Sequence, residues 1–338
     1  MFKIHLFPLN NYNHCLFLLL FTLSFNSIKA QYHWENIDSS YAPLPKDFHV
    51  YKSVDSVEGK QNVMYYAIAP LQDKNLIFSV DTSKNRRLTP KEFFKKNGQP
   101  LLVINGSFFS FKYNSNLNAV VRNGKLVSFN EFNIPGKRSD TLTWYHPFFG
   151  AFGISQNRKA DVAWVYADSS DTYLMASQLP IHAIHDSIDR LTEQEVLNQT
   201  SLVLGHSGKS IPQLKKWKMK TVIGGGPVLI QNGQVKISNN EEMKFAGKAI
   251  HDRHPRTAIG YTKDGHIIIF VSEGRSESAA GLTLPQMAKI LQELGCEEAL
   301  NLDGGGSSCM IINGKKVNYP SDKGEERSVP SVFMIKEK

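Results

Sequence analysis

Two runs of three consecutive glycines each follow a strand-like segment directly, at 224–226 and at 304–306. Glycine is costly in an ordered core unless the backbone must approach another group closely. One such run could be only a bend in the chain, but two are harder to explain in that way. Successive backbone N–H groups can form a concave nest for a phosphate oxygen. We therefore expect these loops to bind an anion through five residues: Gly225, Gly226, Gly304, Gly305 and Ser307.

Side chains suited to chemistry gather in four segments in which a strand-like run leads into a polar, glycine-rich loop. The segments are 102–109, 222–229, 254–260 together with 271–275, and 301–308. Binding and catalytic residues are often carried by loops that a rigid sheet positions. We expect the loops to meet at one rim, where they would bring together Asn105, Arg256, Glu273, Arg275, Asn301 and Asp303.

Several common active-site motifs are absent. Neither glycine run is followed by Lys and Ser or Thr, and the segment after the second run is strand-like where a nucleotide-binding P-loop requires a helix. The segment 205–208 (GHSG) lacks the spacing of a nucleophile elbow. The pairs His182/His185 and His251/His254 have no HExxH-type context, which favours isolated polar surface over metal ligands.

The elements that must position these loops are mostly strands. Apolar or alternating runs predict strands at 63–69, 76–80, 163–167, 267–271 and 309–312. Tight primed turns need residues that tolerate positive φ, and four dipeptides of this kind separate strand-like flanks. They are Asn123-Gly124, Asn232-Gly233, Asp264-Gly265 and Asn313-Gly314. Antiparallel pairing follows from these hairpins.

Helices are few. The clearest is predicted at 284–294, with Thr283 as N-cap, Gly295 after its end and leucine and methionine along one stripe. A second is predicted at 91–96, where Thr89 and a proline precede the first turn. The sequence therefore predicts an α+β fold, in which mixed, largely antiparallel sheets are flanked by a few helices and form a single catalytic domain.

The N-terminal 30 residues have the pattern of a signal peptide, because a lysine precedes a short apolar run that ends near Ala30. The run is about half of the roughly 20 residues that cross a bilayer. Cleavage after Ala30 is expected, and an uncleaved anchor is the alternative because Ile28 is a poor residue at the minus-three position. We expect a periplasmic or secreted chain without stable membrane insertion, divided into a β-rich extension packed on the core, 31–100, and a catalytic domain, 101–336.

The mature charge is mild. Removing Lys3 and Lys29 from 39 basic residues leaves 37 against 31 acidic residues, a formal charge of +6. The cluster at 215–218 (KKWK) is interpreted as solvated surface, and no basic stripe with interleaved aromatic residues indicates a nucleic-acid partner. Cys296 and Cys309 remain after maturation, either as a disulfide or as two buried thiols.

Six segments follow one another as they do in the phosphodiester glycosidase family. They are INGSFF, GGGPVLI, HPRTAIGYTKDG, GLTLPQMAKILQELG, ALNLDGGGSS and ERSVPSVFMI. Between residues 101 and 335 the chain resembles this family, which includes enzymes that remove N-acetylglucosamine joined through its C1 to phosphate. The resemblance implies a hydrolase that acts on a sugar-1-phosphodiester or phosphorylated glycan. The sugar and the aglycone stay open, and Ser107, Cys296 and Cys309 depart from the family pattern.

The resemblance also implies roles for the carboxylates. Cleavage at an anomeric carbon that carries phosphate requires a carboxylate that stabilises or attacks an oxocarbenium-like transition state. Asp303 is expected to be this group. Glu273, at a corresponding strand end, is expected to act as base, acid or ligand of a sugar hydroxyl.

Three arginines, Arg256, Arg275 and Arg327, are expected to clamp the phosphate, because a planar guanidinium offers bidentate donors. A structural ion pair is the alternative for each of them. Asn105 and Asn301 would hydrogen-bond sugar hydroxyls or position the carboxylates.

Two other functions agree with the same loops. One is a non-catalytic protein that binds phosphorylated glycans or a cell-envelope polymer. The other is a metal-dependent phosphodiesterase that breaks the P–O bond. We expect that no cofactor is required, although Asp303 and Glu273 together would be able to hold a divalent cation.

Overall fold

Residues 32–338 are described by a computed structural model, apart from 85, 132, 137–139, 168–170 and 203–212. The predicted signal peptide and the segment 205–208 lie outside the described residues. None of the described helices is both long and apolar enough to span a membrane. The described chain from Tyr32 to Lys338 forms one compact unit.

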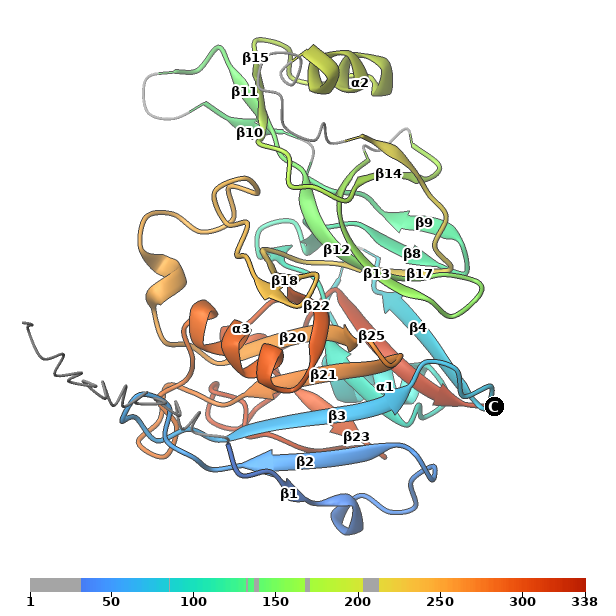
Figure 1. Ribbon diagram of the computed structural model, residues 1–338, viewed down its shortest axis with the longest axis vertical. Helices are drawn as coiled ribbons and strands as arrows, with labels where there is room; N and C mark the ends of the chain where they lie inside the picture. Colours follow the sequence, from blue (N-terminus) through green and yellow to red (C-terminus); the bar gives the residue numbers. More distant parts are fainter. Residues whose placement is uncertain (1–31, 85, 132, 137–139, 168–170, 203–212) are drawn as a thin grey trace, which may run out of the picture. The chain divides into compact units, whose positions relative to one another are not determined.

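An eight-stranded sheet carries most of the loops that the sequence singled out (Figure 1). Its strands, in spatial order, are β1 (Glu35–Asn36), β2 (His49–Ser53), β3 (Met64–Pro70), β21 (His266–Ser272), β20 (Arg256–Thr262), β22 (Cys296–Asn301), β18 (Val228–Gln231) and β19 (Gln234–Val235). All neighbours are antiparallel, with Arg256 opposite Ser272 and Ala258 opposite Asn301. The start of β20 and the ends of β21 and β22 therefore share one edge.

Two further large sheets complete the framework. The five-stranded sheet has the order β24 (Lys315–Lys316), β23 (Met310–Ile312), β5 (Leu102–Asn105), β25 (Ser331–Glu337) and β4 (Leu76–Thr82). The seven-stranded sheet has the order β16 (Lys215–Trp217), β14 (Leu174–Ser177), β13 (Ala160–Tyr166), β12 (Phe149–Ile154), β17 (Thr221–Gly224), β8 (Val120–Arg122) and β9 (Lys125–Ser128). The smaller pairings are formed by β10 (Ile134–Pro135), β11 (Trp144–His146) and β15 (Ile184–Asp186), and by β6 (Phe109–Ser110) and β7 (Ser115–Asn116).

The four predicted hairpin dipeptides connect paired strands. Asn123-Gly124 joins β8 to β9, and both residues have positive φ, 52° and 75°. The dipeptides Asn232-Gly233 and Asn313-Gly314 join β18 to β19 and β23 to β24 in the same conformation. Asp264-Gly265 joins β20 to β21, with positive φ only at its glycine. The local turn chemistry thus fixes these four antiparallel pairs.

Both predicted helices are present. α1 spans Pro90–Lys96 and α3 spans Leu284–Glu293, and each begins with a capping box, from Thr89 and Thr283 respectively. The apolar stripe of α3 packs on the eight-stranded sheet, across β18 and β22 (Figure 1). A third helix, α2 (Glu193–Leu202), was not predicted because its sequence lacks a clear apolar stripe. Short 3₁₀ turns, η1 (Asp38–Ser40), η2 (Ala249–His251) and η3 (Gly305–Ser307), complete the helical elements.

The largest hydrophobic cluster draws on all three large sheets. It includes Ile269 of the eight-stranded sheet, Phe333 of the five-stranded sheet and Phe152 of the seven-stranded sheet. The Phe152 and Phe333 rings meet edge to face at 6.3 Å. A shared core of this kind makes the sheets one domain, and the predicted α+β class is confirmed.

Residues 32–100 supply strands inside two of these sheets. β3 pairs with β21, so that Met64 lies opposite Ser272, and β4 pairs with β25, so that Leu76 lies opposite Glu337. The early part of the chain therefore supports the strands that lead to the loops of interest.

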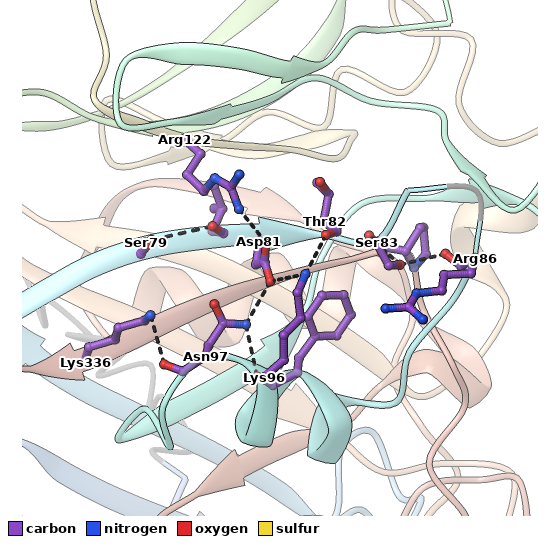
Figure 2. A network of polar contacts seen from close by, with 12 residues as sticks. Ser79, Asp81, Thr82, Ser83, Arg86, Lys96, Asn97, Arg122 and Lys336 are labelled. Atoms are coloured by element: carbon purple, nitrogen blue, oxygen red, sulfur yellow. Dashed lines mark hydrogen bonds and ion pairs between the residues drawn. The ribbon is translucent and has the colours of Figure 1, made fainter.

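An ion pair network around the buried Asp81 joins α1, the five-stranded sheet and the seven-stranded sheet (Figure 2). Asp81 of β4 is 1% exposed, and its carboxylate is 2.7 Å from Lys96 Nζ and 2.7 Å from Arg122 Nη1. Asn97 Nδ2 donates to the same carboxylate over 2.8 Å. Burial alone would raise the pKa of Asp81, but Lys96, Asn97 and the Thr82 amide lower it below its ordinary value. The ionised carboxylate is therefore part of the folded structure.

Substitution Asp81→Asn is expected to lower the free energy of unfolding by about 1–3 kcal/mol, because it leaves two cations without their buried partner. The measurement is urea unfolding at pH 7, with Asp264→Asn at an exposed turn as the control. Since the folded-state pKa of Asp81 is lowered, its contribution is present above the unfolded-state pKa of about 3.9 and is lost as pH falls below it. Equal stability of the two variants at pH 7 would contradict the assignment.

Candidate active site

A pocket of about 240 Å³ opens at the edge where β20 begins and β22 ends. Its lining comes from three of the four predicted loops and from two further segments. The lining residues are Phe108, Phe245, His254, Arg256, Arg275, Asn301, Leu302, Asp303, Gly304, Gly305 and Arg327. The remaining predicted loop, 222–229, does not reach the pocket surface.

Asp303 lies two residues after the end of β22, and its side chain remains partly accessible from the pocket. Burial raises the pKa of its carboxyl to about 6, against the opposing charges of Arg327 and Lys244. The Gly304 amide also favours the carboxylate and donates to its Oδ1 over 3.0 Å. At neutral pH this group is mostly ionised yet poorly hydrated, which strengthens its interaction with a nearby positive centre.

The loop that carries Asp303 is fixed by Asn105, at the end of β5. The Asn105 side chain is fully buried. Its Nδ2 donates to the Asp303 carbonyl over 2.6 Å, and its Oδ1 accepts from the Thr257 hydroxyl at 3.0 Å and from the Cys309 amide at 3.2 Å. Asn105 does not line the pocket. Of its two predicted roles, hydrogen-bonding a sugar hydroxyl or positioning a carboxylate, its contacts agree with the second.

Asn301 does line the pocket. Its Nδ2 donates to the Gly226 carbonyl over 2.7 Å, which fixes the amide plane. Its Oδ1 is buried and accepts no hydrogen bond from any described residue. A buried acceptor without a partner is uncommon in a folded protein and marks Asn301 as a candidate ligand-binding residue.

Arg256 is the most deeply buried cation of the pocket, at 4% exposure. Its Nε donates to the Leu282 carbonyl over 2.9 Å, and its Nη2 donates to the Asp252 carbonyl over 2.7 Å. Burial lowers the pKa of this guanidinium to about 10, so it stays charged at neutral pH. Since Nη1 has no acceptor among the described residues, a donor remains for an anion in the pocket.

Arg275 and His254 form a second basic group. Arg275 Nη2 lies 3.2 Å from His254 Nδ1, and the guanidinium covers Gly305, where a Cβ would lie 3.2 Å from Nη2. Burial and the charges of Arg256 and Arg275 lower the pKa of His254, so the imidazole is neutral at pH 7. The sequence analysis interpreted His254 as polar surface, but it lines the pocket.

Arg327 combines both roles that the sequence left open. It forms a bidentate ion pair with Asp322, with Nε–Oδ2 at 3.0 Å and Nη2–Oδ1 at 3.1 Å, and it also lines the pocket. Its guanidinium lies 5.6 Å from the ring centre of the exposed Phe111. Part of its charge is therefore neutralised by Asp322.

Lys244 is a cation that the sequence analysis missed. Its Nζ lies 4.0 Å from the ring centre of the pocket residue Phe108 and 4.5 Å from that of Phe149. Burial lowers the pKa of Lys244 to about 8, although Glu242 and Asp303 oppose this shift. Nothing in the surrounding sequence marks Lys244, because it belongs to an irregular connection between β19 and β20.

Glu242 holds this connection in place. Its carboxylate is fully buried, and it accepts hydrogen bonds from the Val228 amide at 2.8 Å, the Gly150 amide at 2.9 Å and Trp164 Nε1 at 3.2 Å. Burial nevertheless raises its pKa. These donors from three strands fix the segment that ends in Lys244.

The glycines of the first run serve close packing instead of anion binding. The Gly225 amide donates to the Gly150 carbonyl and the Gly226 amide to the Asn301 carbonyl, over 2.9 and 2.8 Å. A Cβ on Gly225 would lie 2.3 Å from Asn301 O, and one on Gly226 would lie 2.2 Å from Glu242 Oε2. Because both amides are already used, the predicted phosphate contacts of Gly225 and Gly226 are not present in this geometry.

The second run does form part of the pocket. Gly304 and Gly305 line it, and the Gly305 amide donates to the Pro255 carbonyl over 2.8 Å. The Ser307 hydroxyl favours the ionised form of Asp303, although its Oγ has no hydrogen-bond partner of standard geometry among the described residues. The backbone of this run therefore forms the side of the pocket next to Asp303.

Glu273 lies apart from this group. Its Oε1 accepts from the Tyr319 amide over 2.7 Å and from the Tyr65 hydroxyl over 3.4 Å, and it is not among the lining residues of the pocket. Burial raises its pKa. The structure therefore does not bring the two predicted carboxylates together in one pocket.

The described residues contain no cluster of three or more His, Cys, Asp or Glu side chains suited to a metal ion. His185, from the other pair considered, contacts the Thr143 hydroxyl at 2.7 Å and stacks on Tyr145. Cys296 and Cys309 are free thiols buried in separate hydrophobic clusters.

Comparisons with known proteins agree with the resemblance. Residues 182–336 match the family model of phosphodiester glycosidase. Mouse N-acetylglucosamine-1-phosphodiester alpha-N-acetylglucosaminidase is 32% identical over 130 residues, which are 34% of this chain and 25% of the relative. An uncharacterised prophage-derived protein of Bacillus subtilis, YomE, is 42% identical over 83 residues, 25% of this chain and 13% of that protein.

The fold is shared with a solved structure. It is the catalytic domain of zebrafish N-acetylglucosamine-1-phosphodiester alpha-N-acetylglucosaminidase, auto-inhibited by its pro-peptide. The two structures superpose with a TM-score of 0.56. Its identity is 20%, and the match covers 91% of this chain and 89% of that one. The present chain spans about a quarter of the length of the curated mouse relative. Through residues 182–336, just under half of its length, the chain is similar to the phosphodiester glycosidase family.

Proposed function

We propose that this chain is a glycosidase that hydrolyses a sugar-1-phosphodiester between C1 of the sugar and the bridging oxygen. The products are the free sugar and a phosphomonoester. The observation that carries the proposal is a single desolvated carboxylate, Asp303, in a pocket that three arginines line. Such a site combines one anion for a cationic transition state with several cations for an anionic leaving group.

Asp303 would act on the anomeric carbon. As the C1–O bond breaks, positive charge develops at C1 and the ring oxygen, and a poorly hydrated carboxylate stabilises or attacks this centre. Water then supplies the hydroxyl group of the released sugar. Because Gly304 and Gly305 carry no side chains, the sugar can approach Asp303 closely at this side of the pocket. Asn301 Oδ1, which has no partner among the described residues, would accept a hydrogen bond from one of the sugar hydroxyls.

The phosphate would leave as a stable anion, so a second carboxylic acid for its protonation is not essential. Arg256 has a free donor, and Arg275 and Arg327 line the same pocket. Lys244, whose Nζ lies 4.0 Å from the ring centre of Phe108, adds positive potential. Asp303 lines the same pocket as these arginines and Glu273 does not, which supports Asp303 as the catalytic carboxylate.

The substrate and the location of the chain are further parts of the proposal. The name of the mouse relative makes diesters of N-acetylglucosamine-1-phosphate the first substrates to test. The apolar N-terminal run and Ala30 support export to the periplasm or the medium.

Substitution Asp303→Asn is expected to lower kcat on the order of 10²–10⁴-fold and to change substrate affinity by less than about tenfold, because the amide lacks the stabilising charge. The assay measures free sugar released from a panel of sugar-1-phosphodiesters. Glu273→Gln is the matched control, with kcat expected within about threefold of the parent chain. A non-catalytic binding protein would release no sugar in any form of the chain.

Hydrolysis in oxygen-18 water is expected to place the label in the sugar hydroxyl at C1. This outcome follows from C–O cleavage, since the attacking oxygen ends on carbon. Mass spectrometry of both products gives the answer. Label in the phosphomonoester would instead show P–O cleavage, and a chelator-sensitive activity with that pattern would replace the glycosidase by a phosphodiesterase.

The pH dependence of kcat/KM is expected to have two limbs. Asp303 must be ionised, so activity falls as pH drops below about 6. Lys244 must be protonated, so activity falls as pH rises above about 8. In Lys244→Arg the charge persists at higher pH, and only the alkaline limb should move outward. An unchanged alkaline limb in this variant would rule out Lys244 as its origin.

A further inference from the structure

We propose that the β16 edge of the seven-stranded sheet is a second binding site, which takes an anionic polysaccharide chain. The site is a groove formed by β16 with the following residues 218–220, and by the facing residues of β14. The existence of the groove does not depend on the Asp303 pocket, whereas the choice of a glycan as its ligand rests on the proposed function.

The groove consists of two hollows that share Lys216 and Trp217 in their lining. One has a volume of about 300 Å³ and the other about 350 Å³, and the indole lines both. Lys216 also lines both hollows, while Tyr173 and Lys218 line the first and Gln178 the second. An extended ligand that follows β16 would therefore pass across the indole.

Trp217 is held in a fixed orientation. Its Nε1 donates to Asp161 Oδ2 over 2.7 Å. Its six-membered ring lies against Gly153, where a Cβ would be 2.6 Å from the indole carbon Cη2. The six-membered ring is thus packed on the sheet at Gly153, and the indole, which is partly exposed, lines both hollows. A rigid aromatic surface of this kind suits the apolar face of a sugar ring.

The second aromatic residue of the groove carries a cation. Lys216 Nζ lies 3.8 Å from the ring centre of Tyr173. The Tyr173 hydroxyl donates to Glu193 over 3.1 Å, which orients the ring. The ammonium group is therefore placed above an aromatic platform, where an anionic group of a ligand can reach it.

The groove has a one-sided charge. Lys215, Lys216, Lys218 and Lys220 are exposed, and the lining of the two hollows contains no acidic residue. The carboxylates of Asp161 and Glu193 are hydrogen-bonded to the two aromatic side chains, and the charge of Asp171 also acts on Tyr173. The four exposed lysines outnumber these acids at the groove, and a positive potential attracts polyanions. From the sequence alone this lysine cluster is predicted to be solvated surface, but the fold places Tyr173 beside Lys216.

The remaining lining favours a glycan over other polyanions. Amide and hydroxyl groups occupy the walls of the hollows, where they can exchange hydrogen bonds with sugar hydroxyls. They belong to the exposed residues Asn123, Gln156, Thr172, Gln178 and Gln213. A chain of sugars that carries phosphate or carboxylate groups offers the three features that the groove complements, namely flat apolar faces, hydroxyls and negative charges.

The test is equilibrium binding of the mature chain to a phosphorylated mannan, measured by isothermal titration calorimetry, with the dephosphorylated mannan as the neutral probe. The triple variant Lys216→Gln, Lys218→Gln, Lys220→Gln is expected to weaken binding of the phosphorylated polymer by about tenfold or more, because the charges act together. Trp217→Phe should weaken binding of both polymers. The charge-matched control replaces the exposed Lys74, Lys263 and Lys289 by Gln and should bind as the parent does.

Circular dichroism and the thermal midpoint verify that each variant is folded, and a misfolded Trp217→Phe leaves the lysine variant as the test. Affinity for the phosphorylated mannan that is unchanged in the triple variant would overturn the proposal. So would tighter binding of a single-stranded oligothymidylate than of the mannan, which would identify a nucleic-acid site. Because binding is measured without turnover, a chain that binds in the groove but releases no sugar would count only against the proposed glycosidase.

Discussion

The Asn105 side chain is the interaction on which the pocket depends. It joins the end of β5 to the Asp303 carbonyl and to Thr257 of β20, so one buried amide connects the five-stranded sheet to the loop that follows β22 in the eight-stranded sheet. A buried amide that has lost its water must keep these partners, since an unpaired polar group in the core costs about 1–3 kcal/mol. The position of Asp303 is therefore set by strands that are far apart in the chain.

The electrostatics of the pocket follow from this anchoring. Asp303 is held where water is scarce, which raises its pKa, and the cations around it are positioned by carbonyls or rings and only in part by carboxylates. Arg256 is fixed by two backbone carbonyls and interacts with the Asp252 carboxylate only through its charge, whereas Arg327 forms a bidentate ion pair with Asp322. A site that is already oriented in this way needs little rearrangement when charge develops in the substrate.

The two glycine runs, at 224–226 and 304–306, have similar sequences but different structural roles. In both, glycine is required because another backbone or side chain comes within about 3 Å of the place that a Cβ would occupy. The run at 224–226 uses this space to pack against β22 and the buried Glu242, while the run at 304–306 uses it to form a wall beside Asp303. Their amides mostly donate to carbonyls within the protein, so few of them are left for an anion.

The sequence by itself determined the features that depend on neighbouring residues. The hairpins, the capped helices α1 and α3, the α+β class and the strand-end placement of Asp303 and Arg256 all follow from turn chemistry, caps and periodicity. Only the tertiary structure decided which loops meet. A strand-end position does not specify a side chain's surroundings, so Glu273 turned to Tyr65 and Tyr319 instead of the pocket. Lys244 and Phe245 entered the site because Glu242, through donors from three distant strands, fixed an irregular connection that carries no local signal.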